Sequence, residues 1–125
     1  MTQQRHELSL RRQPVEVARA RRHVAQMFAD VPADARSTLQ VLTSEIVTNA
    51  IAHGEGEIVL RTSRTPGEAR VEVLDGSAQP PQLGCAAVDA EGGRGLMLVE
   101  ALSTAWGVRR AQGRDGKAVW FTVQV

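Results

Sequence analysis

The first half of the chain contains two stretches in which apolar residues recur at helical spacing. In residues 14–29, one face of the expected helix is apolar and consists of Val17, Ala20, Val24, Met27 and Phe28. In residues 34–53, the apolar face consists of Leu39, Leu42, Ile46 and Ala50. Gly54 follows the second stretch, and glycine is favoured just past the end of a helix. The pattern therefore predicts two amphipathic helices.

Short runs of apolar and β-branched residues predict strands elsewhere in the chain. They cover residues 6–10, 57–62, 70–74, 106–110 and 118–125. Turn residues at 65–68 join the second run to the third, and turn residues at 113–116 join the last two, so two hairpins are expected. The first run begins inside a polar stretch, residues 1–7, which we otherwise expect to be disordered.

Residues 76–94 show no periodic pattern and are rich in glycine and proline. A loop of this length in a compact domain is usually functional or disordered. Residues 96–102 then predict a short helix. Helices and hairpins in this order predict an α+β fold, a two-layer sandwich with an antiparallel-rich sheet.

Composition and charge narrow the class of protein. The chain has 125 residues and is 42% hydrophobic, which suits a single globular domain over residues 1–125. The net charge of +1 gives no argument for nucleic acid. Arg19, Arg21 and Arg22 make one face of the first helix basic; we expect this face to be solvated, with an acidic protein partner as the alternative.

Cysteine content and hydropathy bear on the compartment. Cys85 is the only cysteine, so neither a disulfide framework nor a cysteine-based metal site can be built within the chain. No apolar run reaches the length of a membrane span, and the polar N-terminus lacks the core of a signal peptide. We therefore expect a cytoplasmic protein that does not contact a membrane.

Three polar residues of the second helix, Glu45, Asn49 and His53, recur every four positions and so form one stripe. The stripe lies at the margin of the apolar face, where polar groups need partners. An asparagine oxygen and a nearby carboxylate can hold Mg²⁺, which keeps other ligands in its shell, and Glu45 could instead act as a general base. A polar cluster that satisfies itself is an equally good interpretation of this spacing.

Two further features lie at the ends of predicted elements. Asp75 ends the strand over 70–74, where its carboxylate could accept a hydrogen bond from the exocyclic amine of adenine; an Asp-Gly turn is the simpler alternative. Glycines at 92, 93 and 95 precede the helix over 96–102. They could let backbone approach a phosphate at a helix N-terminus, or they could form only a flexible loop.

These features together, in this order, resemble the ATP-binding domain of the GHKL superfamily, which includes DNA gyrase and histidine kinases. TSEIVTNAIAH (43–53) resembles the N box, LDGS (74–77) the first glycine box and GGRGLMLV (92–99) the second. GKAVWFTV (116–123) is similar to the closing strand of a small bacterial branch, the anti-sigma-factor serine kinases and related short actinomycete regulators. The resemblance extends from about residue 8 to residue 125.

The resemblance implies the Bergerat ATP-binding fold, with a mixed, mostly antiparallel sheet and helices on one face. It implies ATP and Mg²⁺ as cofactors, with Asn49 as the Mg²⁺ ligand and Glu45 as the catalytic carboxylate. Asp75 would bind the adenine amine, and residues 78–94 would form the ATP lid. His53 would line the phosphate side, and the phosphates would be capped by Gly93, Arg94, Gly95 and Leu96.

The resemblance also implies a function and partners. The expected protein is an anti-sigma factor with serine/threonine kinase activity, which binds a sigma factor and phosphorylates a serine-bearing anti-anti-sigma protein. A homodimer through the edge of the N-terminal strand is also expected. Ser77 stands where the first glycine box usually has glycine, which favours the alternative of a nucleotide-binding interaction module without phosphotransfer. Direct DNA binding by the arginine-rich helix is disfavoured by the low net charge.

Overall fold

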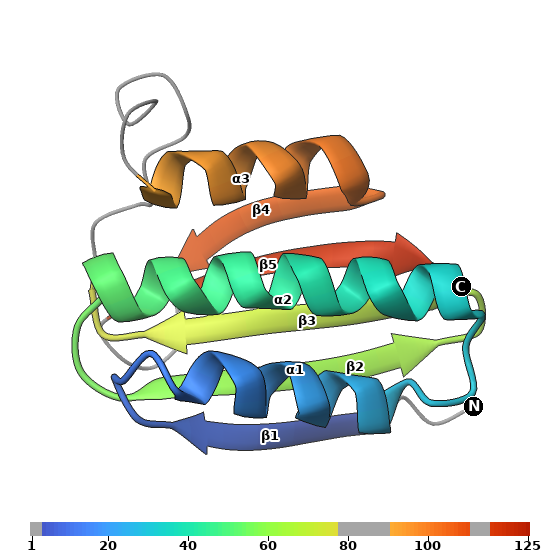
Figure 1. Cartoon of the computed structure of the whole chain (residues 1–125), viewed down its shortest axis with the longest axis horizontal. Helices are drawn as coiled ribbons and strands as arrows, with labels where there is room; N and C mark the ends of the chain where they lie inside the picture. The colour runs from blue at the N-terminus through green and yellow to red at the C-terminus, as the bar shows by residue number, and fades with distance from the viewer. Residues whose placement is uncertain (1–3, 78–90, 111–115) are drawn as a thin grey trace.

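The computed structural model describes residues 4–77, 91–110 and 116–125 (Figure 1). Along the chain the elements are β1 (Gln4–Leu10), α1 (Glu16–Met27), α2 (Ala33–His53), β2 (Ile58–Thr65), β3 (Glu68–Asp75), α3 (Glu91–Leu102), β4 (Ala105–Arg110) and β5 (Lys117–Gln124). The expected helices over 14–29 and 34–53 and both expected hairpins are therefore confirmed. The turn of the second hairpin lies outside the described residues.

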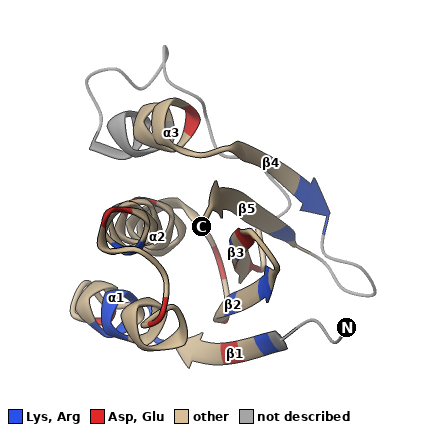
Figure 2. Cartoon of the chain, turned by 90° about the vertical axis from the view of Figure 1, so that its right-hand side faces the viewer, with Lys and Arg blue, Asp and Glu red and all other residues tan. Residues whose placement is uncertain are grey.

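The strands form one five-stranded sheet in the order β1-β2-β3-β5-β4. The helices cover one face of this sheet, and the other face carries no helix in the described structure (Figure 2). This arrangement confirms the predicted two-layer α+β sandwich. Each pair of neighbouring strands is antiparallel, so the described sheet is antiparallel throughout rather than mixed. The reason is that α3 connects β3 to β4, which is not its neighbour in the sheet. β5 then lies between β3 and β4 and runs antiparallel to both.

The core lies between the sheet and α2. Strand side chains alternate between the two faces, and four on the helix side of the central strands, Leu60, Val71, Val73 and Phe121, are at most 1% exposed. They share one cluster with the apolar face of α2, whose Leu39, Leu42 and Ile46 are at most 2% exposed. The pattern of apolar residues along α2 therefore predicted its buried face correctly.

Two element boundaries differ from the prediction. Residues 4–7, expected to be disordered, belong to β1, because β2 extends far enough to pair Gln4 with Arg64 and Arg61 binds Glu7 at 2.8 Å. The third helix begins at Glu91 rather than at residue 96. Glycine costs a helix only about 1 kcal/mol per residue, and the packing of α3 against α2 outweighs that cost.

The outer face of the sheet is covered by its own long side chains. Glu72 has a side chain only 6% exposed, although no described helix lies over it. Arg109 binds its carboxylate at 2.7 Å, and Arg61 and Arg70 lie at 3.8 and 3.6 Å. The guanidinium of Arg70 stacks over the ring of Trp120 at 4.3 Å.

No helix of the described residues is long and apolar enough to cross a membrane.

The burial of α2 gives a direct test of this packing. Leu42→Ala should lower the free energy of unfolding by about 2–5 kcal/mol, because it leaves a cavity in a fully buried site. Urea denaturation measures the loss. The neighbouring Val41, 44% exposed, provides the control, and Val41→Ala should change stability by less than about 0.5 kcal/mol. Equal losses in the two variants would contradict the assigned face of α2.

Candidate functional site

Four element ends meet at one end of the molecule. The C-terminal ends of α2 and β3 and the first residues of α3 and β5 all lie on the left in Figure 1. Hydrogen bonds tie this region together, since Gly54 N–H donates to Ala50 O at 2.9 Å and Gly76 N–H donates to Glu55 O at 2.6 Å. The two segments quoted for the N box and the first glycine box are thus brought side by side.

Asp75 is the best-defined polar group of this region. It ends β3, is 1% exposed and lies opposite Lys117 in the register of β3 and β5. Its Oδ1 accepts from Ser77 N at 2.7 Å and from Lys117 Nζ at 3.1 Å, and its Oδ2 accepts from Lys117 Nζ at 3.0 Å. The bond from Ser77 is that of an Asp-Gly turn. The turn and a buried carboxylate site therefore coexist, and the two interpretations of Asp75 are not exclusive.

Two glycines, Gly54 and Gly116, lie close against Asp75. A Cβ added to Gly54 would lie 2.7 Å from Asp75 Oδ2, and one added to Gly116 would lie 2.1 Å from Asp75 O. Gly116 also has φ of +122°, which other residues rarely adopt. Ser77, where glycine is usual in the resembling motif, is 5% exposed and still makes the turn bond. The serine therefore does not disturb the position of Asp75.

The polar stripe of α2 finds no partner in the part of the chain that the structure describes. Glu45 and Asn49 are half-buried beside the fully apolar face, as the spacing predicted, whereas His53 is exposed because it is the last residue of α2. Among the described residues, none of the three side chains makes a hydrogen bond or ion pair. The interpretation as a self-satisfied cluster is thus not supported, and both oxygen-bearing groups remain available to a ligand.

The first turns of α3 contain the residues expected to cap phosphates. Because the helix begins at Glu91, its unbonded N–H groups include those of residues 91–93. Gly93 therefore lies in the first turn, whose N–H groups have no acceptor inside the helix, while the N–H groups of Arg94, Gly95 and Leu96 are used inside the helix in this conformation. Residues 78–90 of the expected lid, and the side chains of residues 91–96, lie outside the described part of the structure.

Arg12 fixes the end of α2 and was not identified from the sequence. Its guanidinium donates to the carbonyl oxygens of Ala50, Ile51 and Gly56, the last two at 3.0 and 2.8 Å. A cation at a helix C-terminus satisfies carbonyls that the helix leaves unbonded and complements the helix dipole. Arg12 therefore holds the segment that carries Asn49 in place next to the loop before β2.

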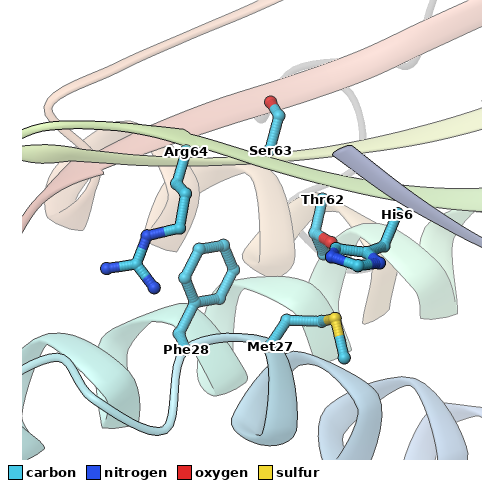
Figure 3. A pocket seen from close by; sticks show the side chains of 6 residues that line it. All are labelled: His6, Met27, Phe28, Thr62, Ser63 and Arg64. Atoms are coloured by element: carbon cyan, nitrogen blue, oxygen red, sulfur yellow. The ribbon is translucent and has the colours of Figure 1, made fainter. Parts of the chain in front are cut away.

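A small hollow lies at the opposite end of the sheet, between β1, β2 and the end of α1 (Figure 3). Its lining consists of His6, Met27, Phe28, Thr62, Ser63 and Arg64. Arg64 is paired with Asp30 at 2.7 Å, and burial, together with the nearby charge of His6, lowers the pKa of His23. The hollow holds the His6 imidazole and the Thr62 and Ser63 hydroxyls, but among the described residues no hydrogen bond joins the imidazole to either hydroxyl, so we assign no chemistry to it.

The donors at the main site fit a nucleotide with one divalent cation. Asp75 offers a buried acceptor for an amine, and Glu45 and Asn49 offer oxygen ligands of the type that Mg²⁺ prefers. No group of three or more His, Cys, Asp or Glu side chains that could hold a metal occurs within the described residues. A metal held by the protein alone is thus not indicated there, whereas Mg²⁺ shared with phosphate oxygens needs only one or two protein ligands.

Comparison with known proteins identifies the family and the fold. A family model described as histidine kinase-like ATPase domain matches residues 10–123. Among solved structures, the histidine kinase domain from Erythrobacter litoralis EL346 blue-light activated histidine kinase is similar in fold, with a TM-score of 0.54 and 21% sequence identity. The match covers 88% of this chain and 59% of that chain. A search of curated proteins gave no match.

Removing the Arg12 guanidinium tests its capping role. Arg12→Met should lower the free energy of unfolding by about 1–3 kcal/mol, because three carbonyl oxygens lose a charged donor. The adjacent Arg11, which is exposed, supplies the control, and Arg11→Met should have little effect in the same thermal or urea denaturation. If both variants were as stable as the wild type, Arg12 would not hold the end of α2.

Proposed function

Because the chain belongs to the histidine kinase-like ATPase domain family, we propose that it binds Mg·ATP where α2, β3, β5 and α3 meet. The observation that carries this site is the buried carboxylate of Asp75, 1% exposed, next to the end of a helix whose Glu45 and Asn49 have no partner among the described residues. A buried ionised group is costly unless it serves a fixed set of donors. The amine of an adenine base is a donor of the required kind.

In this proposal each residue contacts a different part of the nucleotide. Asp75 accepts from the adenine amine, Asn49 supplies an oxygen to Mg²⁺, and the free N–H groups of the first turn of α3, that of Gly93 among them, face the phosphates, beside Arg94, Gly95 and Leu96 of the same helix. His53, exposed at the end of α2, is at most a wall of the phosphate side. When bound, Mg·ATP supplies a phosphoryl group whose charge the metal partly neutralises.

We extend the proposal to phosphotransfer onto a protein. Glu45 lies one helical turn before Asn49, half-buried and without a partner among the described residues. In this proposal its carboxylate accepts the proton of a serine hydroxyl presented by a second protein. Following the resemblance, that second protein is of the anti-anti-sigma type, and the chain itself binds a sigma factor. β1 forms one edge of the sheet and offers a route to a homodimer.

A module that binds nucleotide and a partner without transfer is the second candidate. Ser77 and the existing hydrogen bonds of Asp75 to Ser77 and Lys117 favour it, because the base must fit beside bonds that already exist. Incubation of the wild type with γ-labelled ATP and a serine-bearing partner distinguishes the two functions. Nucleotide binding without label on the partner would favour the module.

Replacing the proposed metal ligand should abolish nucleotide binding. In Asn49→Ala the Mg²⁺ loses its protein oxygen, so calorimetric titration with Mg·ATP should show no binding where the wild type binds. Thr48, the exposed neighbour of Asn49 on α2, gives the control, and Thr48→Ala should bind as the wild type does. Unchanged affinity in Asn49→Ala would remove Asn49 from the site.

Replacing the proposed base should separate binding from transfer. Glu45→Gln should retain Mg·ATP affinity and lose about 10²–10⁴-fold in the rate of label transfer to the partner, the range typical of general-base removal. Glu57→Gln, which changes an exposed carboxylate outside the site, should transfer at the wild-type rate. Full activity in Glu45→Gln would show that another group takes the proton.

A further inference from the structure

The pair formed by Lys117 and Asp75 lies where the proposed function places the base of the nucleotide. Both side chains belong to the helix side of the sheet, and Lys117 is 7% exposed while Asp75 is 1% exposed. Both carboxylate oxygens lie within 3.1 Å of the ammonium nitrogen. Any group that binds Asp75 must therefore come close to the ammonium of Lys117.

The type of cation at this position is informative. The chain contains 15 lysine and arginine residues, and Lys117 is the only lysine among them. A guanidinium is a rigid planar fork that suits paired contacts with one carboxylate, whereas an ammonium is a compact centre with three donors that can point to different acceptors. Among the described residues, the only buried cation is therefore this lysine, whose compact ammonium can donate in several directions beside the proposed base site.

Counting donors and acceptors leaves one of each unused. A carboxylate can accept about four hydrogen bonds, and Asp75 receives two at Oδ1 and one at Oδ2. The ammonium has three N–H donors, and in the described structure its hydrogen bonds all go to Asp75. Within the described part of the chain, one acceptor position on Oδ2 and one N–H of Lys117 therefore remain without a partner, on two atoms that lie 3.0 Å apart.

We infer that Lys117 reads the base together with Asp75: its remaining N–H donates to the ring nitrogen next to the adenine amine, while Asp75 accepts from that amine. The inference rests on the proposed function. The edge of adenine presents an amine donor flanked by ring acceptors, N1 on one side and N7 on the other, which complements an acceptor beside a donor. Guanine places a carbonyl oxygen where adenine has the amine, so this pair selects against guanine.

The competing interpretation is that Lys117 only neutralises Asp75 and competes with the base for it. The two interpretations predict opposite changes in nucleotide affinity when the ammonium of Lys117 is removed. A competitor weakens nucleotide binding, so its removal tightens binding, whereas a donor to the base strengthens binding, so its removal weakens it.

The experiment combines one substitution with two analogues, 1-deaza-ATP and 7-deaza-ATP, which each lack one ring nitrogen. The wild type should bind one of the two about 10–100-fold more weakly than ATP, the loss expected for one charge-assisted hydrogen bond. Lys117→Met should weaken ATP binding by a similar factor. In Lys117→Met the same analogue should bind as ATP does, because the bond is already lost and the two losses do not add.

Arg64→Met serves as the matched control, since it removes a cation that is paired with Asp30 at the opposite end of the sheet, and it should bind ATP as the wild type does. Unchanged or tighter ATP binding by Lys117→Met, with its fold confirmed by circular dichroism, would overturn the inference. If that variant does not fold, the test is the comparison of ATP with the two analogues on the wild type. Equal affinity of the wild type for ATP and for both analogues would overturn the inference. A wild type that binds no nucleotide would instead refute the proposed function, and the inference with it.

Discussion

The arrangement of the site depends on keeping a charged carboxylate buried at the end of β3. Taking Asp75 out of water is costly, and removing one partner of a buried ion pair typically costs about 3–5 kcal/mol. Lys117 and the backbone of Ser77 provide the compensation, and glycine at 54 and 116 leaves room for it. The start of the last strand, Gly116 before it and Gly54 after α2 therefore all contribute to the surroundings of one carboxylate.

α2 links this carboxylate to the rest of the molecule. Its apolar face is the main partner of the sheet in the core, and its other residues include Glu45 and Asn49, which make no hydrogen bond or ion pair within the described structure. Arg12, from the loop after β1, bonds the last carbonyls of the helix. The same helix anchors the core and carries the polar stripe, so the proposed metal ligand, Asn49, lies on an element that the core holds in place. Asp75 and the other groups of the site lie at the C-terminal end of this helix.

Much of the fold could be predicted because it follows from periodicity. The apolar positions of α2 and the alternation in β5 depend on which side chains face the core, and that information is local in the sequence. The sequence was less informative where distant groups compensate each other. Lys117 is an ordinary residue at the start of a strand until the register places it opposite Asp75. Arg12 caps a helix nearly 40 residues away. The start of α3 was missed because its glycines favour a loop by local propensity, and only packing against α2 overrides them.

The single lysine of the chain allows the central claim, a nucleotide site built around Asp75, to be tested directly. In protein labelled with ¹³C at the lysine side chain, Lys117 gives the only lysine signal. The account predicts that this signal shifts as Mg·ATP is added and does not shift with Mg·triphosphate, which lacks the base. A signal that stays unchanged while ATP binding is saturated would show that the base lies elsewhere and would contradict the account.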